Sequence, residues 1–269
     1  QSRYTGYRAG ADWYINSKHT VGVLVNGSVN PGDWNTNGFT NIDKLSTPQL
    51  IDTLLRATNA VSNERNNLNT NFNYRFADTS GHSLNFDIDY GTYDIQGGSY
   101  QPNLYYSPDG GELLRQRIYR NNTPTKIDIF TVKSDYEQRL LKGTLGVGFK
   151  VADVETDNTF DFFNVINGES QLDETVSNRF IYEERTSAGY VNYNRMFGKK
   201  LNVQAGLRVE NTDYEGQLLS ATKDTVNTNN YTELFPSAAL TYTFNPKMGL
   251  NVTYSRRIDR PSYQDLNPF

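Results

Sequence analysis

The chain has 269 residues, a formal net charge of −4 and only 36% hydrophobic residues. Its 19 tyrosines and 14 phenylalanines exclude a disordered chain, and the absence of cysteine excludes disulfides and thiolate metal sites. The negative charge does not favour binding to nucleic acid, and the polar, aromatic-rich composition suits strands with one wet face.

Ten stretches alternate between apolar and polar residues with a period of two. Successive side chains of a strand point to opposite faces, so this pattern predicts β-strands. In residues 67–76, for example, Leu68, Phe72 and Phe76 alternate with asparagines, giving one apolar and one strongly polar face. The predicted strands, in chain order, are residues 7–15, 20–29, 67–76, 83–91, 126–138, 144–151, 184–197, 201–210, 236–244 and 250–255.

Two of these strands are irregular in sequence. In residues 126–138 the alternation slips between Ile129 and Phe130, which predicts a β-bulge. In residues 184–197 the pattern does not decide which face Tyr190 and Val191 take.

Short and long connections alternate along the whole chain. The short ones are residues 16–18, 78–81, 141–143, 197–200 and 245–247, and the long ones are 30–66, 94–125, 153–178 and 211–230. This order predicts a stack of β-hairpins with tight turns at one end and long loops at the other. Within the first long loop, Leu50, Leu54 and Ala57 follow Thr47 at helical spacing, which predicts a short helix.

These features together favour a transmembrane β-barrel over a soluble β-sandwich. Strands of about ten residues that are apolar outside and polar inside, with short turns at one end and long loops at the other, are typical of such barrels. Aromatic residues near strand ends fit the girdles at the two membrane interfaces. We therefore predict an all-β, antiparallel, up-and-down barrel segment of about ten strands, with residues 1–269 forming a single barrel region.

The last residues carry a specific pattern. Residues 254–269 read YSRRIDRPSYQDLNPF, and residues 203–212 and 234–242 read VQAGLRVENT and LFPSAALTY. These three stretches resemble the outer-membrane β-barrel family of Bacteroidetes TonB-dependent receptors. The resemblance is specific over about the last seventy residues, and upstream of them it is one of architecture.

The resemblance implies a barrel of about 22 strands that is plugged by an N-terminal domain. It also implies energised uptake of a scarce nutrient, such as a siderophore, a metal chelate, a vitamin, or a glycan or peptide fragment. This chain has ten predicted strands and no recognisable plug, so we expect an internal section of such a barrel in the bacterial outer membrane. The implied partners are outer-membrane lipid, the plug and remaining strands, the TonB protein, and a surface lipoprotein.

Two other functions stay open. A complete small barrel would act as a passive porin or an adhesion module. An omptin-like barrel protease would need histidine and aspartate at its extracellular end, whereas His19 and His82 both lie at short turns. We therefore expect no enzymatic activity, and we expect no cofactor, metal or nucleic acid.

Several residues are candidates for contact with a solute. The candidate ligand contacts in the loops or the lumen are Arg256, Arg257, Arg260, Tyr263, Tyr100, Tyr105 and Tyr106. The candidate lumen charges on the polar strand faces are Arg75, Asp87, Asp89, Arg208 and Glu210. The charges either line a solute path or, as we favour, pair with one another or hold a plug. The tyrosines either stack on a ligand or pack within the loops.

Overall fold

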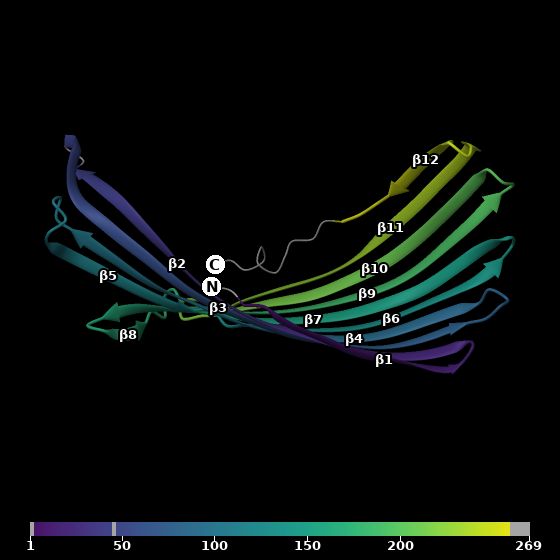
Figure 1. The fold of residues 1–269 in the computed structure, drawn as a ribbon, viewed down its shortest axis with the longest axis horizontal. Helices are drawn as coiled ribbons and strands as arrows, with labels where there is room; N and C mark the ends of the chain where they lie inside the picture. Colours follow the sequence, from purple (N-terminus) through teal and green to yellow (C-terminus); the bar gives the residue numbers. More distant parts are fainter. Residues whose placement is uncertain (1–2, 45–46, 259–269) are drawn as a thin grey trace.

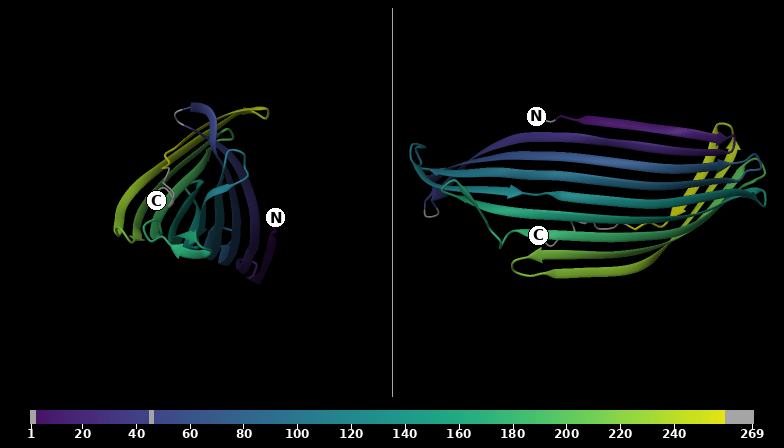
Figure 2. Two further views of the ribbon diagram at one scale, coloured as in Figure 1. Left: turned by 90° about the vertical axis from the view of Figure 1, so that its left-hand side faces the viewer. Right: turned by 90° about the horizontal axis from the view of Figure 1, so that it is seen from below.

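The computed structural model describes residues 3–44 and 47–258, which form one antiparallel sheet curved into an open trough (Figures 1 and 2). The strands are β1 (Thr5–Asn16), β2 (His19–Lys44), β3 (Thr47–Ala77), β4 (Ser83–Tyr106), β5 (Leu113–Asn122), β6 (Thr125–Leu140), β7 (Gly143–Ile166), β8 (Glu169–Leu172), β9 (Asn178–Phe197), β10 (Leu201–Ser220), β11 (Thr225–Asn245) and β12 (Met248–Ser255). The all-β, antiparallel fold predicted from the alternation is confirmed. No helix within the described ranges is long and apolar enough to cross a membrane.

The described strands fill ten positions in the wall. β5 and β6 share one position, because β4 pairs with β6 over residues 83–95 and with β5 over residues 98–106. β7 likewise pairs with both of them on the other side. β8 is a short addition that pairs with the outer end of β7. The ten predicted strands thus correspond to the ten positions of the wall.

The predicted long loops and loop helix are wrong. β2 and β3 continue through this region, where Leu54 pairs with Asn41 and Ala57 pairs with Gly38. Three apolar residues at helical spacing give a weak local preference, and pairing with a long neighbouring strand overrides it. The long connections are therefore hairpins that extend the sheet, and the turns of the described residues are short at both ends.

The predicted bulge is also wrong. Ile129 and Phe130 pair with Gly91 and Tyr90 in an unbroken register. The sequence pattern changes at this point because isoleucines, not polar residues, occupy the inner face of β6 from Ile129 outward. The register also decides the face of Tyr190, which shares a row with Gly148 and Arg208.

The two faces of the sheet differ in exposure. Val147, Val191 and Leu207 are register neighbours and are 39%, 43% and 42% exposed. Thr156 and Thr212, which belong to the opposite face, are only 2% and 1% exposed. Curvature brings side chains together on a concave face and spreads them on a convex one, so the apolar residues are convex and face lipid.

A band of charges ends the apolar convex surface. Lys126 pairs with Asp128 at 3.1 Å, and Arg185 pairs with Asp153 at 2.6 Å. Beside these charges Tyr90 is 43% exposed, and its hydroxyl donates a hydrogen bond of 2.8 Å to Asp128, as expected of an interfacial girdle residue. Charged pairs avoid lipid, so the strands continue beyond the membrane from these charges outward.

The assignment of the faces predicts an asymmetric effect of charge. Val191→Arg should lower the free energy of unfolding by about 2–4 kcal/mol, because it places a guanidinium against lipid in the middle of the apolar band. Asn192→Arg, one residue further on the concave face, is the matched control and should cost much less. Urea unfolding of the full-length protein refolded into bilayers measures both, and equal losses would contradict the assignment.

Candidate functional site: a charged belt on the concave face

A connected set of polar side chains crosses the concave face from β6 to β10. The Lys133 ammonium lies 2.6 Å from the carboxylate of Asp135. The hydroxyl of Tyr190 donates to the same carboxylate at 2.5 Å. The guanidinium of Arg208 lies 5.5 Å from the centre of the Tyr190 ring, so the aromatic ring connects the charges of β6 to those of β10.

The set continues to the end of β12. Arg208 forms a salt bridge with Glu210, which is 7% exposed, and Glu210 lies opposite Glu233 in register. Two carboxylates directly opposite each other repel. Arg256 forms a salt bridge with Glu233, so each glutamate has its own guanidinium. We call the set Lys133, Asp135, Tyr190, Arg208, Glu210, Glu233 and Arg256 the charged belt.

A glycine makes room for the belt's aromatic member. A Cβ atom at Gly148 would lie 2.6 Å from ring atoms of Tyr190. Only glycine leaves enough space at this position for the Tyr190 ring, which extends across β7 so that its hydroxyl meets Asp135 on β6. The inward glycines of residues 143–149 therefore serve packing of the concave face.

Arg256 also fixes the end of the last described strand. Its backbone N–H donates to the carbonyl of Pro236 at 3.1 Å, and its guanidinium donates to the carbonyl of Leu234 at 2.5 Å. The guanidinium lies 5.7 Å from the centre of the Phe235 ring. Arg257 is exposed, and Arg260 and Tyr263 lie outside the described residues.

The other predicted lumen charges lie on the concave face but do not take part in the contacts of the charged belt. Asp89 accepts a hydrogen bond of 2.7 Å from Asn71. Asp87 lies between Asn73 and Lys133 in register, and Arg75 belongs to the next row. The geometry thus gathers all five predicted charges on one face, and a role for them in transport stays a prediction.

The three predicted loop tyrosines do not form one surface. Tyr105 stacks on Arg115 at 4.2 Å, and neighbouring Tyr106 stacks on Arg56 at 4.7 Å. Successive residues of β4 point to opposite faces, so these two rings diverge. Tyr100 is 44% exposed and lines a separate hollow near the β7–β8 hairpin.

The alternation of residues 126–138 also places Lys133 and Asp135 on the polar face, and the two members of the belt that sequence reasoning missed are Glu233 and Tyr190. Glu233 lay between a predicted loop and a predicted strand, and Tyr190 lay in the strand whose faces were undecided. Extending the alternation of residues 236–244 upstream would have placed Glu233 on the polar face. No sequence signal pairs it with Arg256, because that contact depends on the register of β11 and β12.

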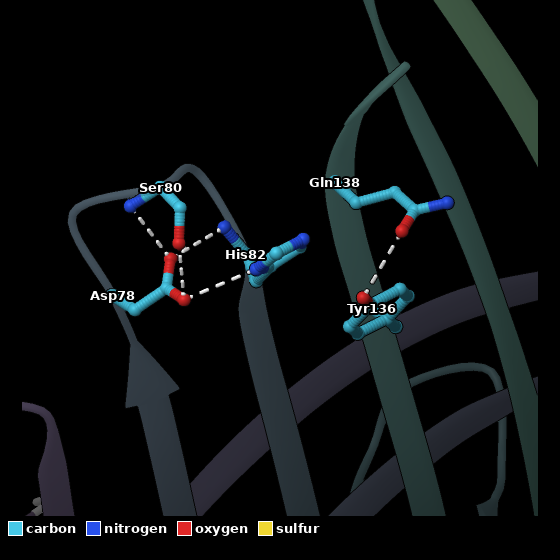
Figure 3. Close-up of polar contacts among 5 residues, drawn as sticks. All are labelled: Asp78, Ser80, His82, Tyr136 and Gln138. Atoms are coloured by element: carbon cyan, nitrogen blue, oxygen red, sulfur yellow. Dashed lines mark hydrogen bonds and ion pairs between the residues drawn. The ribbon is translucent and has the colours of Figure 1, made fainter.

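Both histidines lie at the tight-turn end of the sheet. At the β3–β4 turn, Asp78 accepts hydrogen bonds from the hydroxyl of Ser80 at 2.7 Å and the backbone N–H of His82 at 2.9 Å (Figure 3). The Nδ1 atom of His82 lies 3.0 Å from the same carboxylate. The hydrogen bond from Ser80, followed by those from His82, holds the pKa of Asp78 well below its usual range. His19 contacts the hydroxyl of Tyr74 at 2.7 Å.

The comparisons with known proteins give the family. The model of the "outer membrane protein beta-barrel family" matches residues 74–269, which is more than half of the chain. The chain belongs to this family. This membership places it in the bacterial outer membrane. No curated protein sequence matches the chain.

Solved structures that match the chain include two receptors and a protease. The ferric-catecholate import receptor Fiu from Escherichia coli K12 is 10% identical with a TM-score of 0.51, and the match covers 94% of this chain and 49% of Fiu. The ferric yersiniabactin uptake receptor FyuA from Yersinia pestis is 11% identical with a TM-score of 0.37, and the match covers 91% of this chain and 45% of FyuA. The outer membrane protease OmpT from E. coli is 12% identical with a TM-score of 0.30, and the match covers 90% of this chain and 93% of OmpT.

The likeness to Fiu supports the barrel fold and no more. Among the three, only the match to Fiu is close enough to show the fold. The chain spans about half the length of the two receptors.

The belt predicts energetic coupling between Arg208 and Glu210. Arg208→Met should destabilise the full-length protein, because it removes the guanidinium from a buried carboxylate. Combining it with Glu210→Gln should recover part of the loss, with a coupling energy of about 1–3 kcal/mol in a double-mutant cycle of denaturant unfolding. Arg117→Met, at an exposed position of β5, is the control. Strict additivity of the two belt changes would contradict the coupling.

The β3–β4 turn predicts a dependence of stability on pH. Asp78 has a lower pKa in the folded protein than in the unfolded chain, so its contribution is complete above about pH 4 and is lost as the pH falls. Wild-type protein should be more stable than Asp78→Asn at pH 6, and the difference should shrink steadily below about pH 4. Unfolding curves measured across this range test it, and a constant difference would show that the ionised carboxylate contributes nothing.

Proposed function

We propose that this chain forms part of the wall of a TonB-dependent receptor of the Bacteroidetes type, which imports a scarce nutrient across the outer membrane. The proposed cargo is a siderophore, a metal chelate, a vitamin, or a glycan or peptide fragment. The wall performs no chemistry in this proposal. It supplies a polar lumen and extended outer hairpins for binding and passage.

The observation that carries the proposal is a charged concave face on a sheet with two open edges. Within the described residues, β1 and β12 are the outermost strands of the sheet, and they do not pair with each other. Unpaired backbone groups cost several kcal/mol each in hydrocarbon, so a membrane wall needs partners at both edges. Ten positions plus further strands would enclose a lumen too wide to fill with side chains alone.

The belt supports a lumen that meets water and a second protein surface. Arg256 and Glu233 have side chains that are 45% and 28% exposed, so part of the belt is accessible from the concave side. A wide, hydrated lumen would leak unless it were plugged, and charges of both signs on its wall could hold such a plug. The proposal therefore includes a plug domain and the TonB protein as partners. A surface lipoprotein that covers the outer hairpins would be a further partner.

The alternatives predict different behaviour. A passive porin or adhesion module needs neither energy nor a plug. A protease of the OmpT kind needs catalytic groups at the outer end, whereas His19 and His82 lie at the tight turns of the opposite end. Transport should therefore be tested for its energy dependence first.

Uptake by the native organism tests the function. Deletion of the gene should abolish growth on one scarce nutrient class, and the full-length wild-type gene should restore it only when TonB is present. Binding of that nutrient to the purified full-length protein should precede uptake. Restored uptake in a strain without TonB would favour a passive pore, and no growth defect on any nutrient class would contradict an import function.

A further inference from the structure

Positive charge gathers at the tight-turn end of the sheet. Of the five tight turns at this end, those after β1, β6, β9 and β11 carry lysines, which are Lys18, Lys142, Lys199, Lys200 and Lys247. The turn between β3 and β4 carries an acid, and its carboxylate is already held by Ser80 and His82. The chain as a whole is negative, so the lysines are not a consequence of composition.

Two neighbouring hairpins bring four cations together. Arg195 of β9 lies opposite Gly143 in register, directly beside the turn residue Lys142. Lys199 and Lys200 follow in the turn at the end of β9. β7 pairs with β9, so the β6–β7 and β9–β10 turns are adjacent at this end.

Arg195 has donor capacity that the described residues do not use. Its Nε atom is buried and has no hydrogen-bond partner among them. Its guanidinium lies 4.6 Å from the centre of the Phe197 ring. A buried donor without a partner is costly, and an anion held at the terminal nitrogens of the same guanidinium would offset that cost.

The same place exposes apolar surface. Leu141 is 73% exposed at the tip of the β6–β7 turn, and Phe197 is 46% exposed at the end of β9. The hydroxyl of Tyr193 donates to the carbonyls of Leu140 and Leu141, at 3.1 Å each, which satisfies acceptors of the turn. The surface therefore presents cationic donors beside apolar side chains, at the border of the lipid-facing band.

We propose that Lys142, Arg195, Lys199 and Lys200 bind the phosphate group of an anionic phospholipid in the leaflet on the tight-turn side. A guanidinium can hold two phosphate oxygens, and lysines add charge attraction near the membrane surface. The exposed Leu141 and Phe197 would contact the acyl chains of the same lipid. The apolar neighbours favour a lipid over a soluble phosphate. This inference is independent of nutrient import.

Lipid retention by the full-length protein tests the site. Lys142→Gln/Lys199→Gln/Lys200→Gln should weaken the binding of phosphatidylglycerol by roughly fivefold per charge, on the order of a hundredfold in all. Lys44→Gln/Arg117→Gln/Lys223→Gln removes three exposed charges towards the opposite end and is the matched control. Native mass spectrometry of the proteins with phosphatidylglycerol or with phosphatidylcholine of the same chains gives the relative affinities.

The outcomes separate the sources of phosphate. Selective loss of phosphatidylglycerol in the test variant, with the control unchanged, supports the site. Equal loss in both variants, or equal binding of the two lipids to wild-type protein, would overturn it. Displacement of the lipid by an equal concentration of glycerol phosphate would show a site for soluble phosphate and would also overturn it. Folding of both variants in detergent is checked first, by comparing their resistance to denaturation by heat with that of the wild-type protein.

Discussion

The need to pair every backbone group in lipid governs this structure. A membrane wall has no water to satisfy free N–H and C=O groups, so its strands must form continuous ladders. The register shifts of the described sheet lie near strand ends, at Tyr14/Asn16, Ile42/Asp43, Asp43/Lys44, Tyr105/Tyr106 and Thr243/Asn245. An unbroken ladder keeps the alternation of faces strict through the membrane band, because a slip of one residue would exchange the lipid and lumen faces.

That strict alternation explains which parts of the fold could be predicted. The membrane part of each strand has an apolar face and a polar face, so the sequence shows a clear period of two there. Beyond Asp128 and Asp153, which lie on neighbouring rows of the convex face, both faces meet water, and the period disappears although the strands continue. The sequence of the outer hairpins therefore looks like loop, and a stretch such as residues 47–59 looks like a helix. Only the neighbouring strand decides its conformation.

The candidate site shows the same limit at the level of single residues. Alternation placed Arg208 and Glu210 on the polar face, because the face of a residue depends only on its position within its own strand. Their partners depend on register between strands, which brings Glu233 opposite Glu210 and Tyr190 beside Arg208. Register follows from turn geometry and from packing across the sheet, as in the space that Gly148 leaves for Tyr190. Individual strands could thus be predicted, whereas the network across them could not.

The charged belt and the lysines of the tight turns differ in how their charges are balanced. On the concave face, charges of both signs are interleaved, so Arg208 and Arg256 offset Glu210 and Glu233 without an external ion. At the tight turns none of the five lysines forms an ion pair with a described residue, so their charge is open to a partner outside the described protein. A leaflet of anionic lipid supplies that balance where the apolar band ends, so the same end that closes the hairpins would also fix the depth of the wall in the membrane.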